Sequence, residues 1–138
     1  MGLIDHNDLI RTMRYIRDDL HPTDPWDLAY YSPFYPEAVL PEYDVDHPDR
    51  KPGPGMLLRA ARDMGLDLTG SVMIGDHLKD IRAAHAAGCK GILVSTGRGN
   101  SQIELLISEG MGPGDPGYPD AIVQDIRSAF HLLKEGFR

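Results

Sequence analysis

The sequence predicts an α/β fold with a Rossmann-like parallel sheet and flanking helices. Two observations support this prediction: short apolar segments alternate with segments of helical periodicity, and no internal repeat or low-complexity tract suggests another class. The chain has 138 residues, enough for one domain with a hydrophobic core, so we expect residues 1–138 to form a single domain.

The expected elements follow from apolar spacing, caps and breakers. Helices are expected at residues 7–20, 54–64, 77–87, 103–109 and 126–133. Strands are expected at residues 26–31, 71–75, 91–95 and 121–123, and a proline-rich loop at residues 32–54. In a parallel sheet the functional site lies at the carboxyl ends of the strands, which here directs attention to the loops after Tyr31, Ile74 and Ser95.

Composition excludes several classes of protein. The 21 acidic and 14 basic residues give a net charge of −7, which argues against a nucleic-acid surface but not against a small phosphorylated metabolite. No apolar run is long enough to span a membrane, and the first residues lack signal-peptide character, so we expect a cytoplasmic protein. Cys89 has no partner for an intrachain disulfide and is expected to be a small buried side chain.

A glycine and a carboxylate, Gly75 and Asp76, end one expected strand and lead into a helix. The carboxylate would face the functional edge of the sheet, where a hard oxygen ligand suits Mg²⁺. The structural alternative is that Asp76 caps the helix that follows it.

Two adjacent cations, Arg50 and Lys51, lie in the loop before another expected helix. Arginine binds phosphate in a bidentate manner and lysine acts as a point charge, so this loop could receive a phosphate group. The alternative is an ordinary solvated pair of surface charges.

Together these motifs resemble the histidinol-phosphate and D-glycero-D-manno-heptose-1,7-bisphosphate phosphatases of the haloacid dehalogenase-like superfamily. The resemblance covers residues 30–97, about half of the chain. The matching segments are Tyr30 to Pro33 with Pro36 and Glu37, Arg50 to Ala61, Met73 to Asp76 with Asp80, Ala86 to Cys89, and Ile92 to Gly97.

The resemblance implies roles for four residues. Lys51 would be catalytic and would neutralise the transferring phosphoryl group, Arg50 would bind substrate phosphate, His77 would contact substrate, and Asp76 would be a ligand of Mg²⁺. Asp80 is expected to support this loop or to cap the helix. His85 is expected to be a satisfied histidine in the core.

The sequence departs from the family at its start. The family nucleophile, an aspartate in an Asp-x-Asp motif, follows the first strand, and residues 1–8 contain no such strand and motif. We therefore expect that the sequence begins late, that the central first strands of the sheet are absent, that the edge of the strand ending at Gly75 is open, and that this chain alone is inactive.

The sequence also departs from the family in its long loop. Many members bind zinc there through a Cys-x-His and a Cys-x-Cys pair, and this chain has Ser32 and Phe34 in place of the first and His47 and Asp49 in place of the second. Structural zinc requires four good ligands, so we expect none here. The loop would be held by its prolines and aromatic residues, Phe34, Tyr35 and Tyr43.

The expected function is magnesium-dependent hydrolysis of a small phosphomonoester, a sugar (heptose) bisphosphate, through an aspartyl-phosphate formed on a nucleophile outside this chain. Histidinol phosphate is the alternative substrate. Two other hypotheses are a non-catalytic relative that binds phosphate or a partner, and a receiver-like signalling domain, in which Arg50, Lys51 and the long loop would have no counterpart.

Overall fold

The computed structural model describes residues 6–15, 18, 27–34 and 46–137 of the chain. It divides into two compact units, Met1–Tyr30 and Tyr31–Arg138, which are considered separately. In the first unit, helix α1 (His6–Tyr15) confirms the start of the helix expected at residues 7–20. Most of the expected last turn lies outside the described residues.

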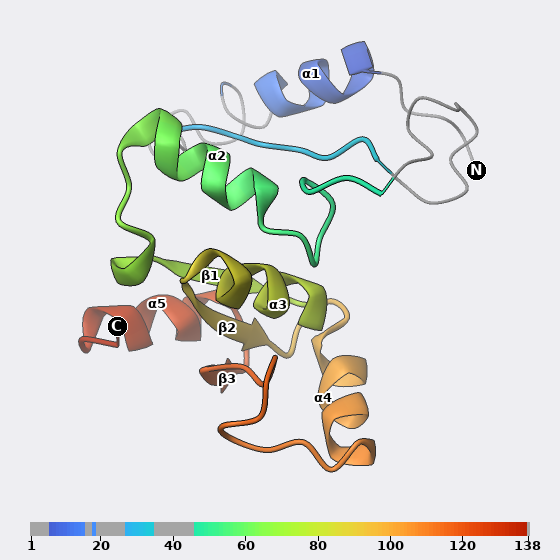
Figure 1. Cartoon of the computed structure of the whole chain (residues 1–138), viewed down its shortest axis with the longest axis vertical. Coiled ribbons are helices and arrows are strands. Elements are labelled where there is room, and N and C mark those ends of the chain that lie inside the picture. The colour runs from blue at the N-terminus through green and yellow to red at the C-terminus, as the bar shows by residue number, and fades with distance from the viewer. Residues whose placement is uncertain (1–5, 16–17, 19–26, 35–45, 138) are drawn as a thin grey trace. The chain divides into compact units, whose positions relative to one another are not determined.

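The second unit contains a three-stranded parallel sheet with the strand order β1-β2-β3 (Figure 1). The strands are β1 (Val72–Gly75), β2 (Lys90–Val94) and β3 (Ala121–Val123). Ile74 pairs with Ile92, and Ile92 with Ala121, so all three strands end at the same edge of the sheet. The predicted α/β class and parallel sheet are confirmed. Within the part of the chain that the structure describes, β1 pairs with β2 alone and its other edge is open.

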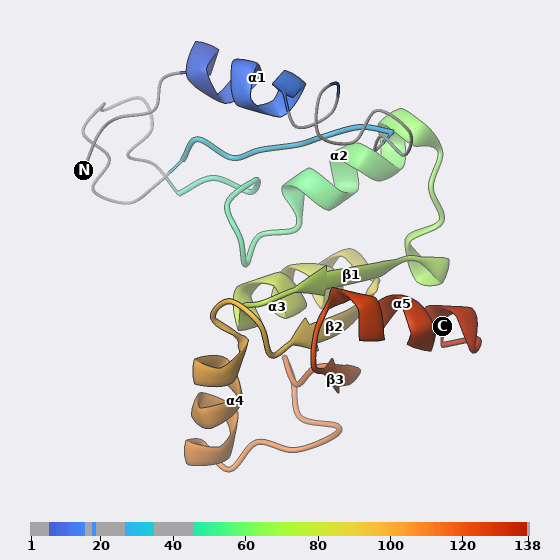
Figure 2. The ribbon, with the colours of Figure 1, turned by 180° about the vertical axis from the view of Figure 1, so that it is seen from behind.

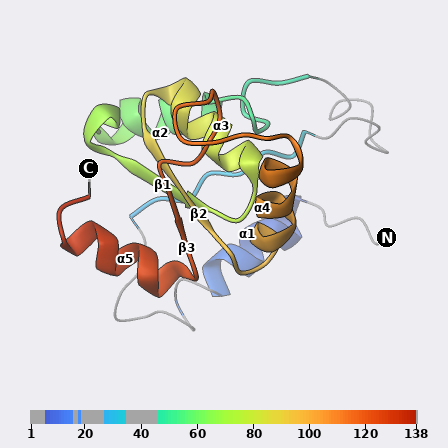
Figure 3. The same ribbon diagram turned by 90° about the horizontal axis from the view of Figure 1, so that it is seen from below.

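Helices flank this sheet. They are α2 (Gly55–Met64), α3 (Leu78–Ala87), α4 (Gly99–Ser108) and α5 (Ile126–Lys134), with a short 3₁₀ helix, η3 (Leu68–Gly70). Figures 2 and 3 show α3 on one face of the sheet and α5 on the other. Helix α2 lies on the α3 side and contacts α3.

The core follows the alternation of side chains along β2. Leu93 packs with Leu78 and Ile81 of α3 and with Leu106 of α4, and all four are at most 2% exposed. The neighbouring residues of β2, Ile92 and Val94, point to the opposite face and pack against Ala129 of α5. Two apolar layers therefore hold β2 at the centre of the described sheet.

The strand predicted at residues 26–31 is wrong in its described part, because residues 27–31 form no strand. Trp26 lies outside the described residues. A short apolar and aromatic segment has strand propensity, but it becomes a strand only when a neighbour satisfies its backbone hydrogen bonds. Residues 27–31 are not part of the described sheet, whose strand order is β1-β2-β3.

The second helix has the predicted ends but not the predicted burial. It follows Pro54 and stops at Gly65, as expected from sequence. The stripe of Leu57, Ala60, Ala61 and Met64 was expected to be buried, yet no residue of α2 is buried and Met64 is 37% exposed. The reason is that α2 packs on α3 and not directly on the sheet, so its apolar face is only half covered.

Two further differences concern local turns. Helix α4 begins at Gly99, whereas the sequence predicted a start at residue 103. The helical hydrogen bonds begin directly after the turn that follows β2, as in the bond from Gln102 N–H to Arg98 O. The 3₁₀ helix η3 was not predicted; its sequence signal is Asp67, whose carboxylate accepts hydrogen bonds from the backbone and side chain of Thr69.

The single cysteine and one histidine lie close to their predicted environments. Cys89 is 7% exposed, and burial raises the pKa of its thiol. The Nε2 atom of His85 lies 2.8 Å from Oδ2 of Asp120, which also accepts the Gly91 N–H at 2.7 Å. His85 is therefore satisfied, as expected, but its side chain is 31% exposed and borders the core rather than filling it.

Among the residues that the structure describes, no helix combines the length and the apolar character needed to cross a lipid bilayer.

Replacing Leu93 by alanine should destabilise the fold strongly. Leu93 is fully buried between α3 and α4, and truncating a buried leucine costs about 2–5 kcal/mol of unfolding free energy through lost apolar contact and an unfilled cavity. Urea unfolding followed by circular dichroism measures this. The matched control is Ile107→Ala, since Ile107 is 73% exposed and its truncation should change stability by about 0.5 kcal/mol or less. Equal effects at both positions would contradict the assigned core.

Asp120 should make stability depend on acid pH. Burial acts to raise the pKa of Asp120, but hydrogen bonds from Gly91 and His85 outweigh it and hold the pKa below its usual 3.8. The contribution of Asp120 to stability is therefore fully present at a pH above its pKa in the unfolded chain. It is lost as the pH falls through its pKa in the folded protein, which is lower. We expect Asp120→Asn to be less stable at neutral pH and to show a shallower stability loss below about pH 4. Urea midpoints between pH 7 and pH 3 test this. The control is Glu104→Gln, which should leave the pH dependence of stability unchanged. If stability falls with pH as steeply in Asp120→Asn as in the unsubstituted chain, the assignment to Asp120 is refuted.

Candidate functional site

Two loops meet at the carboxyl edge of the sheet, one after β1 and one after β2. Asp76 follows β1 directly, and its Oδ2 atom accepts a hydrogen bond from the backbone N–H of Arg98 at 3.0 Å. Gly97, with φ of 61°, is required for this approach, because a Cβ there would collide with the Asp76 carboxylate. The second loop therefore fixes one oxygen of Asp76.

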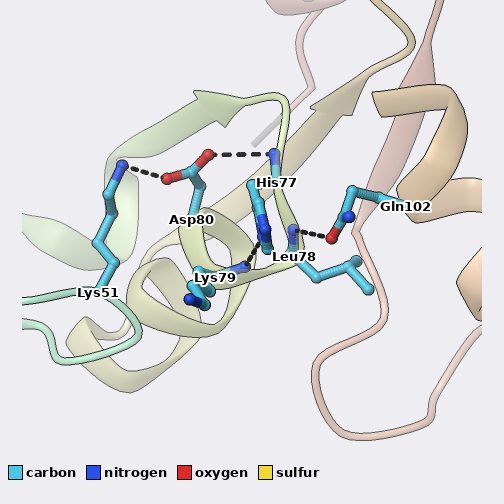
Figure 4. A network of polar contacts seen from close by, with 6 residues as sticks. All are labelled: Lys51, His77, Leu78, Lys79, Asp80 and Gln102. Carbon is cyan, nitrogen blue, oxygen red and sulfur yellow. Dashed lines mark hydrogen bonds and ion pairs between the residues drawn. The ribbon is translucent and has the colours of Figure 1, made fainter. Parts of the chain in front are cut away.

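Asp80 is the buried charge of the site, with 4% of the residue exposed. Its Oδ1 atom forms an ion pair with the ammonium of Lys51, and its Oδ2 atom accepts the backbone N–H of His77 at 3.2 Å (Figure 4). A Cβ at Gly75 would collide with this carboxylate, so glycine at the end of β1 makes room for Asp80. The predicted supporting and capping role of Asp80 is confirmed.

The turn from His77 to Asp80 satisfies all but one of its own backbone donors. The Nδ1 atom of His77 accepts the Lys79 N–H at 3.1 Å, and together His77 and Asp80 form a capping box. The Leu78 N–H is bonded from outside the turn, by the side-chain oxygen of Gln102 at 3.2 Å (Figure 4). His77 is therefore the helix cap, and the alternative that Asp76 caps α3 is wrong.

Arg50 and Lys51 lie in a tightly turned loop before α2. Within it, the Arg50 N–H donates to His47 O and the Gly53 N–H donates to Arg50 O, each at 2.8 Å, and the Lys51–Pro52 peptide is cis. Lys51 reaches Asp80, whereas the guanidinium of Arg50 donates to the carbonyl oxygen of Phe34 at 2.7 Å. The two adjacent cations thus have different partners.

The long loop is held by contacts among the positions that differ from the zinc-binding pattern. The rings of Phe34 and His47 stack with centroids 3.8 Å apart and planes inclined by 15°. His47 Nδ1 accepts the Asp49 N–H at 3.1 Å, and the Asp49 carboxylate pairs with Arg59 of α2. The expected aromatic contribution is confirmed for Phe34, while Tyr35 and Tyr43 lie outside the described residues. The buried Ser32 hydroxyl has no hydrogen-bond partner among the described residues.

The metal-binding capacity of this site is small. Both oxygens of Asp80 already have partners, Lys51 and the His77 N–H, so a metal ion would compete with these contacts. Asp76 has one oxygen bound to Arg98 N–H and the other without a hydrogen bond from the described residues. Within residues 6–15, 18, 27–34 and 46–137, no group of three or more histidine, cysteine or acidic side chains could hold a metal ion.

The structure therefore brings Lys51 to the turn that carries Asp76 and His77, with Asp80 as the link. Arg50 is tied to the long loop instead. Sequence reasoning missed Gln102 and the backbone of Arg98, since neither belongs to a chemical motif. The one available signal was Gly97, whose place after a strand indicates a close backbone approach.

Comparison with known proteins supplies the family. The model of the HAD-hydrolase-like family matches residues 49–129, more than half of the chain. The D-glycero-D-manno-heptose-1,7-bisphosphate 7-phosphatase of Thermosynechococcus vestitus is 41% identical over 110 residues, which are 78% of this chain and 53% of that protein. The D-glycero-β-D-manno-heptose-1,7-bisphosphate 7-phosphatase of Photorhabdus laumondii is 47% identical over 74 residues, which are 52% of this chain and 39% of that protein.

A solved structure agrees with these relatives. The D,D-heptose 1,7-bisphosphate phosphatase from B. bronchiseptica, complexed with magnesium and phosphate, superimposes with a TM-score of 0.72 and 28% identity, over 96% of this chain and 66% of that one. The chain spans about two fifths to one half of the length of these two curated relatives. From the matched model, the relatives and the shared fold, the chain belongs to the haloacid dehalogenase-like hydrolase family.

Proposed function

We propose that this chain is the phosphate-neutralising part of a magnesium-dependent phosphatase that hydrolyses a sugar bisphosphate. The observation that carries the proposal is the ion pair between Lys51 and the buried Asp80, which brings a cation to the turn bearing Asp76. The substrate is a D-glycero-D-manno-heptose 1,7-bisphosphate, and the phosphate removed is the one at position 7. The names of the two curated relatives and of the solved structure support this choice.

Lys51 is proposed to neutralise the phosphoryl group as it transfers. The side chain of Lys51 is 40% exposed while that of its partner Asp80 is 5% exposed, so the cation is anchored by a buried carboxylate and its own side chain is open to solvent. A fixed charge that needs no reorganisation during the reaction is the most effective kind of electrostatic stabilisation. Arg50 is proposed to bind a substrate phosphate, since a guanidinium offers several donors and can keep its bond to Phe34 O meanwhile.

Asp76 is proposed to be a magnesium ligand through its second carboxylate oxygen. One such oxygen fits the preference of Mg²⁺, which keeps several waters and takes one or two carboxylates plus substrate phosphate. The bound ion would supply positive charge to the phosphoryl oxygens. His77 is proposed to contact substrate through the ring nitrogen that does not cap α3. Further ligands would come from residues other than those described.

The nucleophile is proposed to be an aspartate outside these 138 residues, which forms the aspartyl-phosphate. A covalent intermediate divides a difficult hydrolysis into two easier steps. Histidinol phosphate remains the alternative substrate, because the resemblance covers both phosphatases. The alternative of a non-catalytic relative predicts phosphate binding without turnover. The single-domain organisation and the cytoplasmic location expected from sequence stay predictions.

The chain alone should not release phosphate, whereas a longer protein that includes upstream coding sequence with an Asp-x-Asp strand should. Uncatalysed phosphomonoester hydrolysis is among the slowest known reactions, and fixed charges without a nucleophile do not overcome its barrier. In the longer protein, Asp76→Asn should lower magnesium-dependent kcat at least about 100-fold, because a metal contributes several kcal/mol to the transition state. Phosphate release from heptose bisphosphate and from histidinol phosphate measures both effects.

The control for this experiment is Glu104→Gln, which alters an exposed carboxylate away from the site. Magnesium-dependent turnover by the 138-residue chain, lost in Asp76→Asn, would place the nucleophile within the chain and overturn this part of the proposal. Normal kcat in the Asp76→Asn form of the longer protein would remove Asp76 from the metal site.

The long loop should bind no structural zinc. The four positions of the family pattern carry Ser32, Phe34, His47 and Asp49, and the ring of His47 is stacked on Phe34 with its Nδ1 atom already bonded. Tetrahedral zinc requires four ligands, which these residues do not supply. Elemental analysis of protein purified without added zinc should give less than about 0.1 zinc per chain. Stoichiometric zinc that disappears in His47→Ala would contradict this, and His131→Ala is the matched control.

A further inference from the structure

Two hydrogen bonds connect the start of α4 to the turn that follows β1. The Arg98 N–H donates to Asp76 Oδ2 at 3.0 Å, and Gln102 Oε1 accepts the Leu78 N–H at 3.2 Å. They lie on either side of His77 in the sequence, so the turn from Asp76 to Leu78 is held at both ends. We propose that these two contacts form a clamp, called here the α4 clamp, and that Gln102 is a positioning residue for Asp76 and His77. The consequence for metal binding rests on the proposed function.

The Leu78 N–H depends on Gln102 because its position leaves it no local partner. The first backbone donors of a helix have no intrahelical acceptor and require a cap. In α3, the donors of His77, Lys79 and Asp80 are satisfied within residues 77–80. The donor of Leu78 is satisfied by another helix. Leu78 is 2% exposed, so without Gln102 this N–H would be largely shielded from water.

Helix α4, which carries Gln102, packs against the core through apolar side chains. Leu106, on the turn after Gln102, is 2% exposed and packs against Leu78 and Ile81, with Ile103 beside them. This apolar contact holds α4 against α3, and the hydrogen bond from Leu78 to Gln102 joins the same two helices (Figure 4). A side chain carried by a packed helix holds its target more rigidly than one carried by a loop.

The other half of the clamp orients the Asp76 carboxylate. One oxygen is held by Arg98 N–H, and the nearby Gly97 lets the backbone come close enough for this bond. A carboxylate held at one oxygen presents the second in a fixed direction, which reduces the ordering needed when a cation binds. Residues of α4 thereby act on the proposed metal ligand without touching the metal or the substrate.

The test compares two substitutions of Gln102 in the 138-residue chain. Gln102→Met keeps the length of the side chain and removes the acceptor, whereas Gln102→Glu keeps an acceptor oxygen. Amide hydrogen exchange measured by NMR should accelerate about tenfold at Leu78 in Gln102→Met, with less than about twofold change at Lys79, and Gln102→Glu should restore protection. Glu104→Met, at an exposed position of the same helix, is the matched control and should leave Leu78 unchanged.

Unchanged exchange at Leu78 in Gln102→Met would overturn the proposal. So would acceleration spread evenly over α3 and β2, because that result indicates a purely structural role.

A magnesium chloride titration followed at the Asp76 and His77 amides separates this inference from the proposed function. If both are right, Gln102→Met weakens magnesium binding about three- to tenfold and Gln102→Glu restores it. If the unsubstituted chain shows no magnesium-dependent shift at Asp76 but Leu78 exchange still responds to Gln102, the clamp stands and the proposed metal role of Asp76 fails. Magnesium binding that is equally tight in all variants would contradict the positioning of Asp76.

Discussion

The site is organised around the carboxylate of Asp80, a charge that lies almost completely inside the protein. A buried carboxylate is tolerated only when its oxygens are paired and hydrogen-bonded, and here one oxygen pairs with Lys51 while the other accepts the His77 N–H. This single group therefore connects three features: the loop before α2, the end of β1 and the cap of α3. Removing one partner of a fully buried pair costs about 3–5 kcal/mol. The exposure of Lys51 reduces that cost, because water can partly replace the ammonium.

The local arrangement of charge bears on how an acidic protein could bind the anionic substrate proposed for it. The net charge of −7 opposes the approach of a phosphate from a distance. Near the site, however, two acidic groups are neutralised by specific partners: Asp80 by Lys51, and Asp49 by Arg59. Each of these cations is held in place by its carboxylate partner, and the charges elsewhere on the surface are screened by salt beyond about 10 Å.

Sequence patterns predicted the strands of the sheet and the helices that pack on it. Apolar spacing and helix-ending residues, on which these predictions depend, are properties of neighbouring residues in the sequence. Gly65 and Gly88 both end helices in the left-handed conformation, as expected from their positions. The patterns failed where a partner distant in sequence decides the outcome. Residues 27–31 have strand propensity but do not join the described sheet, and α2 has an apolar stripe of which no residue is buried.

The same distinction applies to the site. Asp76, Lys51 and Arg50 were singled out from the sequence because charged residues beside glycine and proline form a chemical pattern, and of the two cations Lys51 pairs with Asp80 while Arg50 bonds to Phe34 O. Gln102 has no such pattern, and its acceptor role depends on the direction in which α4 leaves the sheet edge. Arg98 contributes a backbone N–H, which every residue except proline possesses, so its identity carries no signal.

The site thereby combines residues of two kinds. Among the groups proposed to touch substrate or metal, Asp76 and His77 follow the end of β1, and Arg50 and Lys51 lie in the loop before α2. Loops of this kind can be reached by a ligand. The groups that hold them in place lie on packed helices or are buried, as Gln102 and Asp80 are tied to α4 and α3. Loops alone would leave Asp76 and His77 free to reorient, and each reorientation would have to be reversed on binding. Helices α3 and α4 fix the turn from both sides. The conformational entropy of Asp76 and His77 is therefore lost when the protein folds and not when a ligand binds.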